Sequence, residues 1–183
     1  QLLPSEHPDL RPLGVCGAVI PWNFPLLMLA WKVAPALAAG NTIVLKPAEW
    51  TPITASMLAD LSLEAGIPPG VLNVLQGAGG EAGAALVAQP GIRRISFTGS
   101  PATARLIGEA AARNLTPVSF ELGGKSPLIV CDDADMELAV TTAAGQYDNA
   151  GQVCLAGTRL LVHRDVLDEF SSRLREKIAA IRL

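Results

Sequence analysis

Short apolar runs alternate with stretches of helical periodicity along most of the chain. Each run is bounded by glycine, proline or polar residues, which is the pattern of short buried strands. The first five predicted strands lie at Gly14–Ile20, Asn41–Leu45, Val71–Leu75, Arg94–Phe97 and Val118–Glu121.

Helices are predicted between these strands, where apolar residues recur at helical spacing. Thr51 as N-cap and Pro52 in the first turn mark the start of one helix, and Ser100 followed by Pro101 marks the start of another. The predicted helices cover Leu26–Ala39, Pro52 to Gly66, Gly80–Ala88 and Pro101 to about Ala112.

This strict alternation predicts an α/β fold, namely a Rossmann-like parallel sheet with helices on both faces. Ligands of such sheets bind beyond the carboxyl ends of the strands. Functional residues are therefore expected just after the strands.

A second α/β unit is predicted after the glycine pair Gly123-Gly124, which we interpret as a domain boundary between residues 1–123 and 124–183. Its predicted strands and helices are Leu128–Cys131, Ala134 to about Tyr147, Leu160–Val162 and Asp165–Ile181. The last helix has one predicted apolar stripe, formed by Leu167, Phe170, Leu174 and Ile178.

Composition narrows the class of protein. Half of the residues are apolar and the net charge is −3, so the chain is expected to be globular and has no electrostatic footprint for nucleic acid. No apolar run approaches the roughly 18 residues needed to cross a bilayer, and the first residues lack the pattern of a signal peptide. A cytoplasmic protein without nucleic-acid or membrane partners is predicted.

The three cysteines are too widely spaced for a zinc motif or an even disulfide set. Cys16 and Cys131 fall inside apolar predicted strands and are interpreted as inert. Cys154 lies in a loop of small residues, Gly151–Gly157, where a thiol can be exposed and nucleophilic. His7 and His163 have no ligand-like neighbours, so no metal site is predicted.

Four further motifs follow predicted strands. Pro-Trp-Asn-Phe-Pro encloses Asn23, an amide donor suited to an oxyanion hole, and Phe-Glu-Leu-Gly-Gly-Lys offers Glu121 as a base. Lys46 and Glu49 of Lys-Pro-Ala-Glu can grip the hydroxyls of a ribose, and Gly99 and Ser100 of Phe-Thr-Gly-Ser can admit a phosphate at a helix N-terminus. Taken alone, Phe-Thr-Gly-Ser fits plain helix capping at least as well. The other three motifs alone are more often a capping turn, a solvated ion pair or a solvent-facing side chain.

The glycine-rich turn Gly77–Gly83 resembles a dinucleotide fingerprint, but no acidic residue occurs from Ala82 to Gly108 to hold a ribose. We therefore interpret it as a tight turn between a strand and a helix.

Together, in order and spacing, the five motifs Pro-Trp-Asn-Phe-Pro, Lys-Pro-Ala-Glu, Phe-Thr-Gly-Ser, Glu-Leu-Gly-Gly-Lys and Gly-Gln-Val-Cys resemble the NAD(P)-dependent aldehyde dehydrogenase superfamily. The resemblance runs from about Pro12 to Leu183. It implies a partial cofactor-binding domain over residues 1–123 and the start of a catalytic domain over 124–183.

The resemblance implies oxidation of an aldehyde to a carboxylic acid through a thiohemiacetal and a thioester. Cys154 would be the nucleophile, Glu121 the base that activates water, and Asn23 with the Cys154 backbone N–H the oxyanion hole.

The same resemblance implies the cofactor contacts. Lys46 and Glu49 would hold the adenosine ribose, Gly99 and Ser100 would hold the pyrophosphate, and Trp22 and Leu122 would line the cofactor cleft. Glu49 favours NAD over NADP, because a carboxylate accepts a hydrogen bond from a free 2′-hydroxyl and repels a 2′-phosphate. Lys46 acts in the opposite direction, so NADP stays the alternative cofactor.

Two departures from the family pattern stand out. Ala104 replaces the second glycine of the phosphate-binding turn, and family members are more than twice as long as this chain. The chain is therefore interpreted as a fragment with weak or no turnover alone, whose full-length form is a homo-oligomer. The alternatives are a non-catalytic nucleotide-binding module and a structural protein on an enzyme fold.

Overall fold

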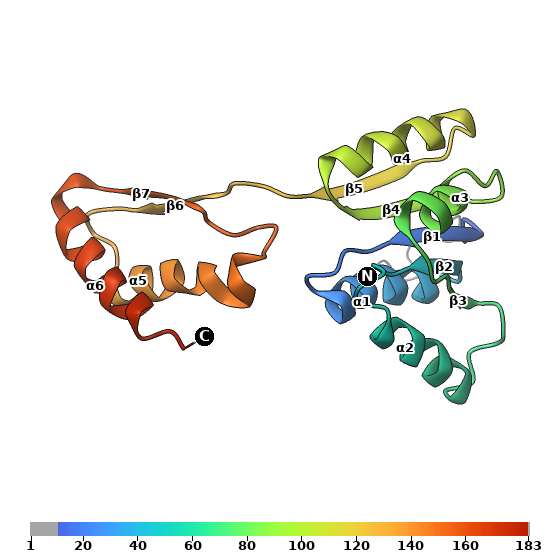
Figure 1. The fold of residues 1–183 in the computed structure, drawn as a ribbon, viewed down its shortest axis with the longest axis horizontal. Helices are drawn as coiled ribbons and strands as arrows, with labels where there is room; N and C mark the ends of the chain where they lie inside the picture. The colour runs from blue at the N-terminus through green and yellow to red at the C-terminus, as the bar shows by residue number, and fades with distance from the viewer. Residues whose placement is uncertain (1–10, 183) are drawn as a thin grey trace. The chain divides into compact units, whose positions relative to one another are not determined.

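A computed structural model describes residues 11–182, and the chain divides into two units, one that ends at Leu122 and one over Gly123–Leu183. The sheet of the first unit is entirely parallel, with the strand order β3-β2-β1-β4-β5 (Figure 1). The strands are β1 (Val15–Val19), β2 (Thr42–Lys46), β3 (Leu72–Val74), β4 (Arg94–Gly99) and β5 (Val118–Leu122).

Helices cover both faces of this sheet, because its strands carry apolar side chains on both sides. The helices are α1 (Pro25–Ala38), α2 (Ile53–Glu64), α3 (Ala84–Val87) and α4 (Pro101–Arg113). Helices α1 and α2 pack on one face, against residues such as Ile43 and Leu45. Helices α3 and α4 pack on the other face, against Ile95 and Phe97. The predicted α/β fold with helices on both faces is confirmed.

The helix starts follow the predicted chemistry in one case and depart from it in another. Ser100 caps α4, since its hydroxyl accepts a hydrogen bond from the Thr103 N–H at 3.2 Å. The prediction of Thr51 as the N-cap of α2 is wrong, because the Thr51 N–H turns back to the Ala48 carbonyl and Pro52 becomes the N-cap residue.

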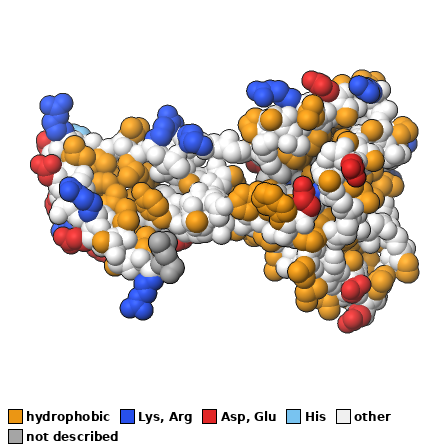
Figure 2. Space-filling model, viewed as in Figure 1, with side chains coloured by type: hydrophobic (Ala, Val, Ile, Leu, Met, Phe, Trp, Pro, Cys, Tyr) orange, Lys and Arg blue, Asp and Glu red, His pale blue; other side chains and the backbone are white. Residues whose placement is uncertain are grey.

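Helix α2 leaves an apolar stripe uncovered within its unit. Ile53, Met57 and Leu61, spaced one turn apart, are 70, 57 and 54 % exposed, respectively. Figure 2 shows hydrophobic side chains at the surface over this helix. The first unit therefore has an exposed apolar stripe along α2.

The second unit is a parallel pair of strands with helices on one face. Its elements are β6 (Pro127–Val130), α5 (Met136–Ala144), β7 (Arg159–Val162) and α6 (Leu167–Ala179). The core between strands and helices contains Val130, Val140, Phe170 and Leu174. Short 3₁₀ segments follow α5 (Gly145–Gly151) and precede α6 (Arg164–Val166).

Two expectations for the second unit are wrong. Strand β6 ends at Val130, where its pairing with Val162 ends, so Cys131 follows the strand and is exposed. Leu167 begins α6 and is 45 % exposed, so the buried stripe starts only at Phe170.

Over residues 11–182, no helix is long and apolar enough to cross a membrane. In the same range, no group of three or more His, Cys, Asp or Glu residues could hold a metal ion. His7 lies outside the described residues, and His163 accepts a hydrogen bond from the Asp165 N–H through its Nδ1 atom at 3.4 Å.

Candidate active site

The predicted residues of the first unit follow the ends of neighbouring strands. The pairing of Val19 with both Lys46 and Phe97, and of Gly99 with Leu122, brings these strand ends to one edge of the sheet. Trp22 and Asn23 follow β1, Lys46 ends β2, Gly99 ends β4 with Ser100 after it, and Glu121 and Leu122 end β5. The strand order reverses between β1 and β4, which is where open α/β sheets bind ligands.

Lys46 and Glu49 form a pair that is buried at one end and open at the other. The Lys46 side chain is 2 % exposed, and its Nζ atom donates to the Pro47 carbonyl at 2.9 Å and to Glu49 Oε2 at 3.3 Å. Backbone hydrogen bonding within Glu49 and the Lys46 ammonium lower the pKa of the Glu49 carboxyl, which is half exposed. An ionised acceptor thus faces solvent beside a fixed cation.

Gly99 is required by packing. A Cβ atom at Gly99 would lie 2.5 Å from Cζ of Phe97, whose ring packs edge-on against Phe120 with centroids 6.2 Å apart. The hydroxyl of Ser100 is engaged in capping α4, so a phosphate would meet the backbone and the positive end of the helix dipole there.

The glycine-rich turn lines a cavity that sequence reasoning missed. Residues Gly79–Gly83 form a single π-helical turn that leads into α3. A cavity of about 420 Å³ lies between this turn and α4, and its lining includes Val19, Gly80, Gly83, Val87 and Ile107. Its walls are mostly apolar, which suits a flat aromatic base.

Two aromatic side chains flank the same sheet edge. The rings of Trp22 and Trp50 lie 6.4 Å apart with planes tilted by 48°, and Trp22 is 42 % exposed. Trp50 directly follows Glu49 in the chain. Asn23 is partly buried in the turn between β1 and α1.

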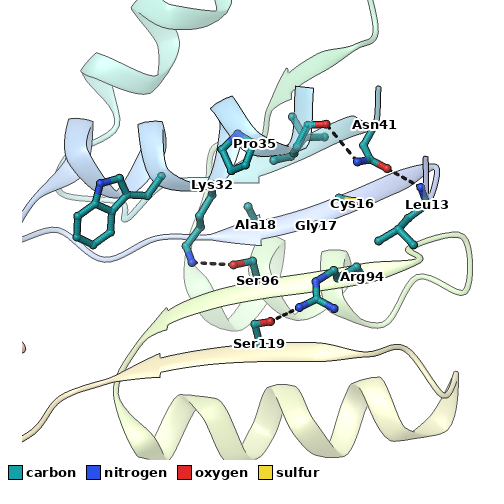
Figure 3. A pocket seen from close by; sticks show the side chains of 13 residues that line it. Leu13, Cys16, Gly17, Ala18, Lys32, Pro35, Asn41, Arg94, Ser96 and Ser119 are labelled. Atoms are coloured by element: carbon teal, nitrogen blue, oxygen red, sulfur yellow. Dashed lines mark hydrogen bonds between the residues drawn. The ribbon is translucent and has the colours of Figure 1, made fainter. Parts of the chain in front are cut away.

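A second cavity, of about 270 Å³, lies under α1 and contains none of the predicted site residues. Figure 3 shows Lys32 reaching from α1 to Ser96 on β4, at 2.8 Å, and Arg94 reaching to Ser119 on β5. Burial lowers the pKa of Lys32, and the Glu121 carboxylate opposes part of this shift. The candidate base therefore lies within electrostatic reach of a desolvated ammonium.

The candidate nucleophile Cys154 belongs to the second unit, where it is partly buried. Its carbonyl accepts a hydrogen bond from the Gly124 N–H at 3.2 Å. The residues just before it, Asn149 and Ala150, have φ values of +52° and +57°.

The other two cysteines differ from each other. Cys16 is buried under α1, and desolvation raises the pKa of its thiol. Cys131 is exposed after β6, which makes it accessible to reagents. Only Cys16 therefore has the environment of an inert thiol.

A five-stranded parallel sheet in this order, with a cavity and a capped helix at its carboxyl edge, defines an open α/β fold of the Rossmann type. The chain belongs to the aldehyde dehydrogenase family, whose model matches residues 8–183.

Individual relatives give the same result. Phenylacetaldehyde dehydrogenase of Pseudomonas fluorescens is 56 % identical, with 91 % of this chain and 35 % of the relative covered. Betaine aldehyde dehydrogenase of Staphylococcus aureus, solved with NAD+, superimposes with a TM-score of 0.89 at 45 % identity, covering 93 % and 34 % of the two chains. An NADP-dependent enzyme of E. coli superimposes with a TM-score of 0.92 at 45 % identity, covering 94 % and 36 %. The chain spans about a third of the length of the curated relatives it matches.

Proposed function

We propose that this chain is the cofactor-binding and nucleophile-bearing part of an enzyme that oxidises an aldehyde to a carboxylic acid with NAD+. The observation that carries the proposal is the arrangement at the carboxyl edge of the first sheet. The pair Lys46 and Glu49, the glycine-lined cavity and the capped start of α4 lie there around one switch point.

The residues present fit a dinucleotide. The cavity of about 420 Å³ would take the adenine ring, since it is apolar and within the roughly 300–1,000 Å³ range of ligand sites. Lys46 and Glu49 would hold the adenosine ribose, and the backbone at Gly99 and Ser100 would hold the pyrophosphate. Trp22 and Leu122, both partly exposed, would line the rest of the cleft.

Glu49 favours NAD+ over NADP+. Its carboxyl has a lowered pKa and is therefore ionised at neutral pH, so it would accept a hydrogen bond from a 2′-hydroxyl and repel a 2′-phosphate. Lys46 would not offset this repulsion fully, because its ammonium already donates to the Pro47 carbonyl and to Glu49.

When bound, NAD+ supplies a hydride acceptor. The thiolate of Cys154 would add to the aldehyde carbon, and the resulting oxyanion would be stabilised by the Asn23 amide and the Cys154 N–H. Loss of hydride from this adduct leaves a thioester on Cys154. Glu121 would then take a proton from water, which attacks the thioester and releases the acid and the thiolate.

These roles join residues of different units, because Asn23 and Glu121 belong to the first and Cys154 to the second. Their cooperation in one active site is supported by the family membership and by the intact motifs. The complete protein is proposed to be a cytoplasmic homo-oligomer, although some relatives are named as mitochondrial enzymes.

The direct test measures NAD+ binding by calorimetry and oxidation of a panel of small aldehydes by the complete protein. The Cys154→Ala variant should bind NAD+ with unchanged affinity and lose at least about 10³-fold in kcat, since it lacks the nucleophile. The Glu121→Gln variant should form the thioester and hydrolyse it about 10²- to 10⁴-fold more slowly. Mass spectrometry would then detect the acyl group on Cys154.

A second candidate function is a nucleotide-binding module without catalysis. It is favoured by the position of Lys46, Glu49 and the cavity, which all lie in the first unit, whereas Cys154 lies in the second. NAD+ binding without turnover in the complete protein would establish it. Absence of both binding and turnover would contradict both functions.

A further inference from the structure

The loop that carries Cys154 is fixed at two points within the second unit. At Cys154 itself, the backbone carbonyl accepts a hydrogen bond from the Gly124 N–H at 3.2 Å. After it, the Gly157 N–H donates to Oε1 of Gln146 at 2.6 Å. One backbone anchor thus lies at the nucleophile and the other lies after it, at Gly157, and only the second depends on a side chain.

The second anchor is buried. Gly157 has no room for a side chain, because a Cβ atom there would lie 3.1 Å from Cβ of Leu128 on β6 and 3.5 Å from Oε1 of Gln146. A buried N–H without an acceptor is unfavourable, so this position needs the amide oxygen that it contacts.

Gln146 also binds the helix that precedes the loop. Its Nε2 atom donates to the carbonyl of Thr142 in the last turn of α5, at 2.7 Å. The last carbonyls of a helix have no partner within it, so this bond satisfies a group that the helix leaves open. One amide therefore joins the end of α5 to the loop.

The intervening backbone does not hold this geometry by its own preference. Asn149 and Ala150 both have left-handed φ values, and Gly151 follows with φ +72°. Non-glycine residues adopt such angles at a cost, so the segment keeps its path only where the surroundings impose it.

We propose that Gln146 is a positioning residue for the nucleophile. It acts through the loop and does not contact the substrate: by clamping Gly157 to Thr142, it keeps the thiol and N–H groups of Cys154 in one orientation. The inference rests on the proposed role of Cys154 as nucleophile.

The test uses the complete protein with two substitutions of similar size. Gln146→Met removes both hydrogen bonds and should lower kcat by about 10- to 100-fold, while the affinity for NAD+ and the KM for aldehyde stay within about twofold. Gln146→Glu keeps the acceptor for Gly157 but, when ionised, cannot donate to Thr142. Its activity relative to the native protein should rise as the pH falls and the carboxyl becomes protonated.

A second readout does not depend on turnover. The rate of Cys154 alkylation by iodoacetamide, followed by peptide mass spectrometry with Cys131 as the internal reference, should change in Gln146→Met and recover in Gln146→Glu at low pH. Gln89→Met, on an exposed glutamine after α3, is the control and should leave both readouts unchanged.

The outcomes separate the two claims. If the native protein oxidises aldehydes and Gln146→Met matches it in kcat and alkylation rate, the positioning role is wrong. If Gln146→Met fails to fold, a pH-independent activity ratio between Gln146→Glu and native protein overturns the role instead. If the native protein neither oxidises aldehydes nor shows a reactive Cys154, the proposed function itself fails.

Discussion

The two units differ in how completely their strands are covered. The first has five strands with helices on both faces and a separate apolar core on each face. The second has two strands, one core and an uncovered face on which Ile129 and Leu161 are 66 and 53 % exposed. An isolated pair of strands is marginal, so the second unit depends far more on its two helices.

This difference separates the residues proposed to bind the cofactor from the residue proposed to react with the substrate. Every side chain proposed to hold the adenosine half of the cofactor is fixed within the well-covered first unit, whereas the nucleophile lies on a loop of the second. Binding should therefore withstand local damage better than catalysis does.

The largest effect is expected from Phe170→Ala in the second unit. Phe170 is 2 % exposed in the only core found among the described residues of that unit, so the cavity should cost about 3–5 kcal/mol in its free energy of unfolding. Hydrogen exchange should show lost protection in residues 123–182 and retained protection in β1 to β5. Leu167→Ala, on the exposed start of the same helix, is the control. Equal loss in both units would mean that they unfold as one.

A smaller loss is expected from Gly99→Ala in the first unit. The added Cβ would overlap the Phe97 ring at 2.5 Å, and such overpacking costs about 1–3 kcal/mol. Urea unfolding followed by circular dichroism measures the loss. Gly91→Ala, where an added Cβ meets nothing within 4 Å, should be neutral. A Gly99→Ala protein as stable as the control would refute the packing role.

Glu49→Gln tests whether Lys46 and Glu49, the proposed ribose grip, act independently of the second unit. Replacing the ionised acceptor by an amide should weaken NAD+ binding by about tenfold and narrow the preference over NADP+. Calorimetry should give the same factor in the native and Phe170→Ala backgrounds, because the grip lies in the first unit. Glu64→Gln, at the exposed end of α2, should have no effect. If the loss of NAD+ affinity caused by Glu49→Gln changes when Phe170 is replaced, the first unit does not bind the cofactor independently of the second.

The smallest effect concerns Lys32 and pH. Burial lowers its folded-state pKa below the ordinary 10.5, so the unfolded chain binds the proton more tightly. Stability should therefore rise as the pH increases through the folded-state pKa towards 10.5. Lys32→Met should remove this rise in urea unfolding compared at about pH 8 and pH 10. The control Lys125→Met, on an exposed lysine, should keep the rise of stability with pH. An identical slope in the native and Lys32→Met proteins would contradict the assignment of this rise to Lys32.

Periodicity was enough to predict the five parallel strands and their helices, because apolar runs and helical spacing are local signals. The ends of strands and helices were harder to predict. Cys131 continues an apolar run, yet β6 stops at Val130 because its partner strand supplies no further pairing. Thr51 has the chemistry of an N-cap, but the backbone turn at Ala48 moves the helix start past Pro52.

The candidate site likewise has features that follow from local motifs and features that depend on the fold. The positions of Lys46, Glu49 and Ser100 at strand ends could be predicted because each lies within one short motif, and their roles stay predictions. The cavity beside Gly80 was not, because its other wall is α4, which the fold and not the local sequence brings to the turn. Nothing in the local sequence singled out Gln146, because its proposed role depends on a hydrogen bond from a glycine eleven residues further along the chain.

The contact between Trp22 and Trp50 gives the protein an optical property. Reduced nicotinamide absorbs light where indole emits, and these two rings lie beside the proposed ribose grip. Trp31, exposed on α1, supplies a background emission that does not depend on that contact. The intrinsic fluorescence of the chain should therefore report binding of the reduced cofactor directly, without a label.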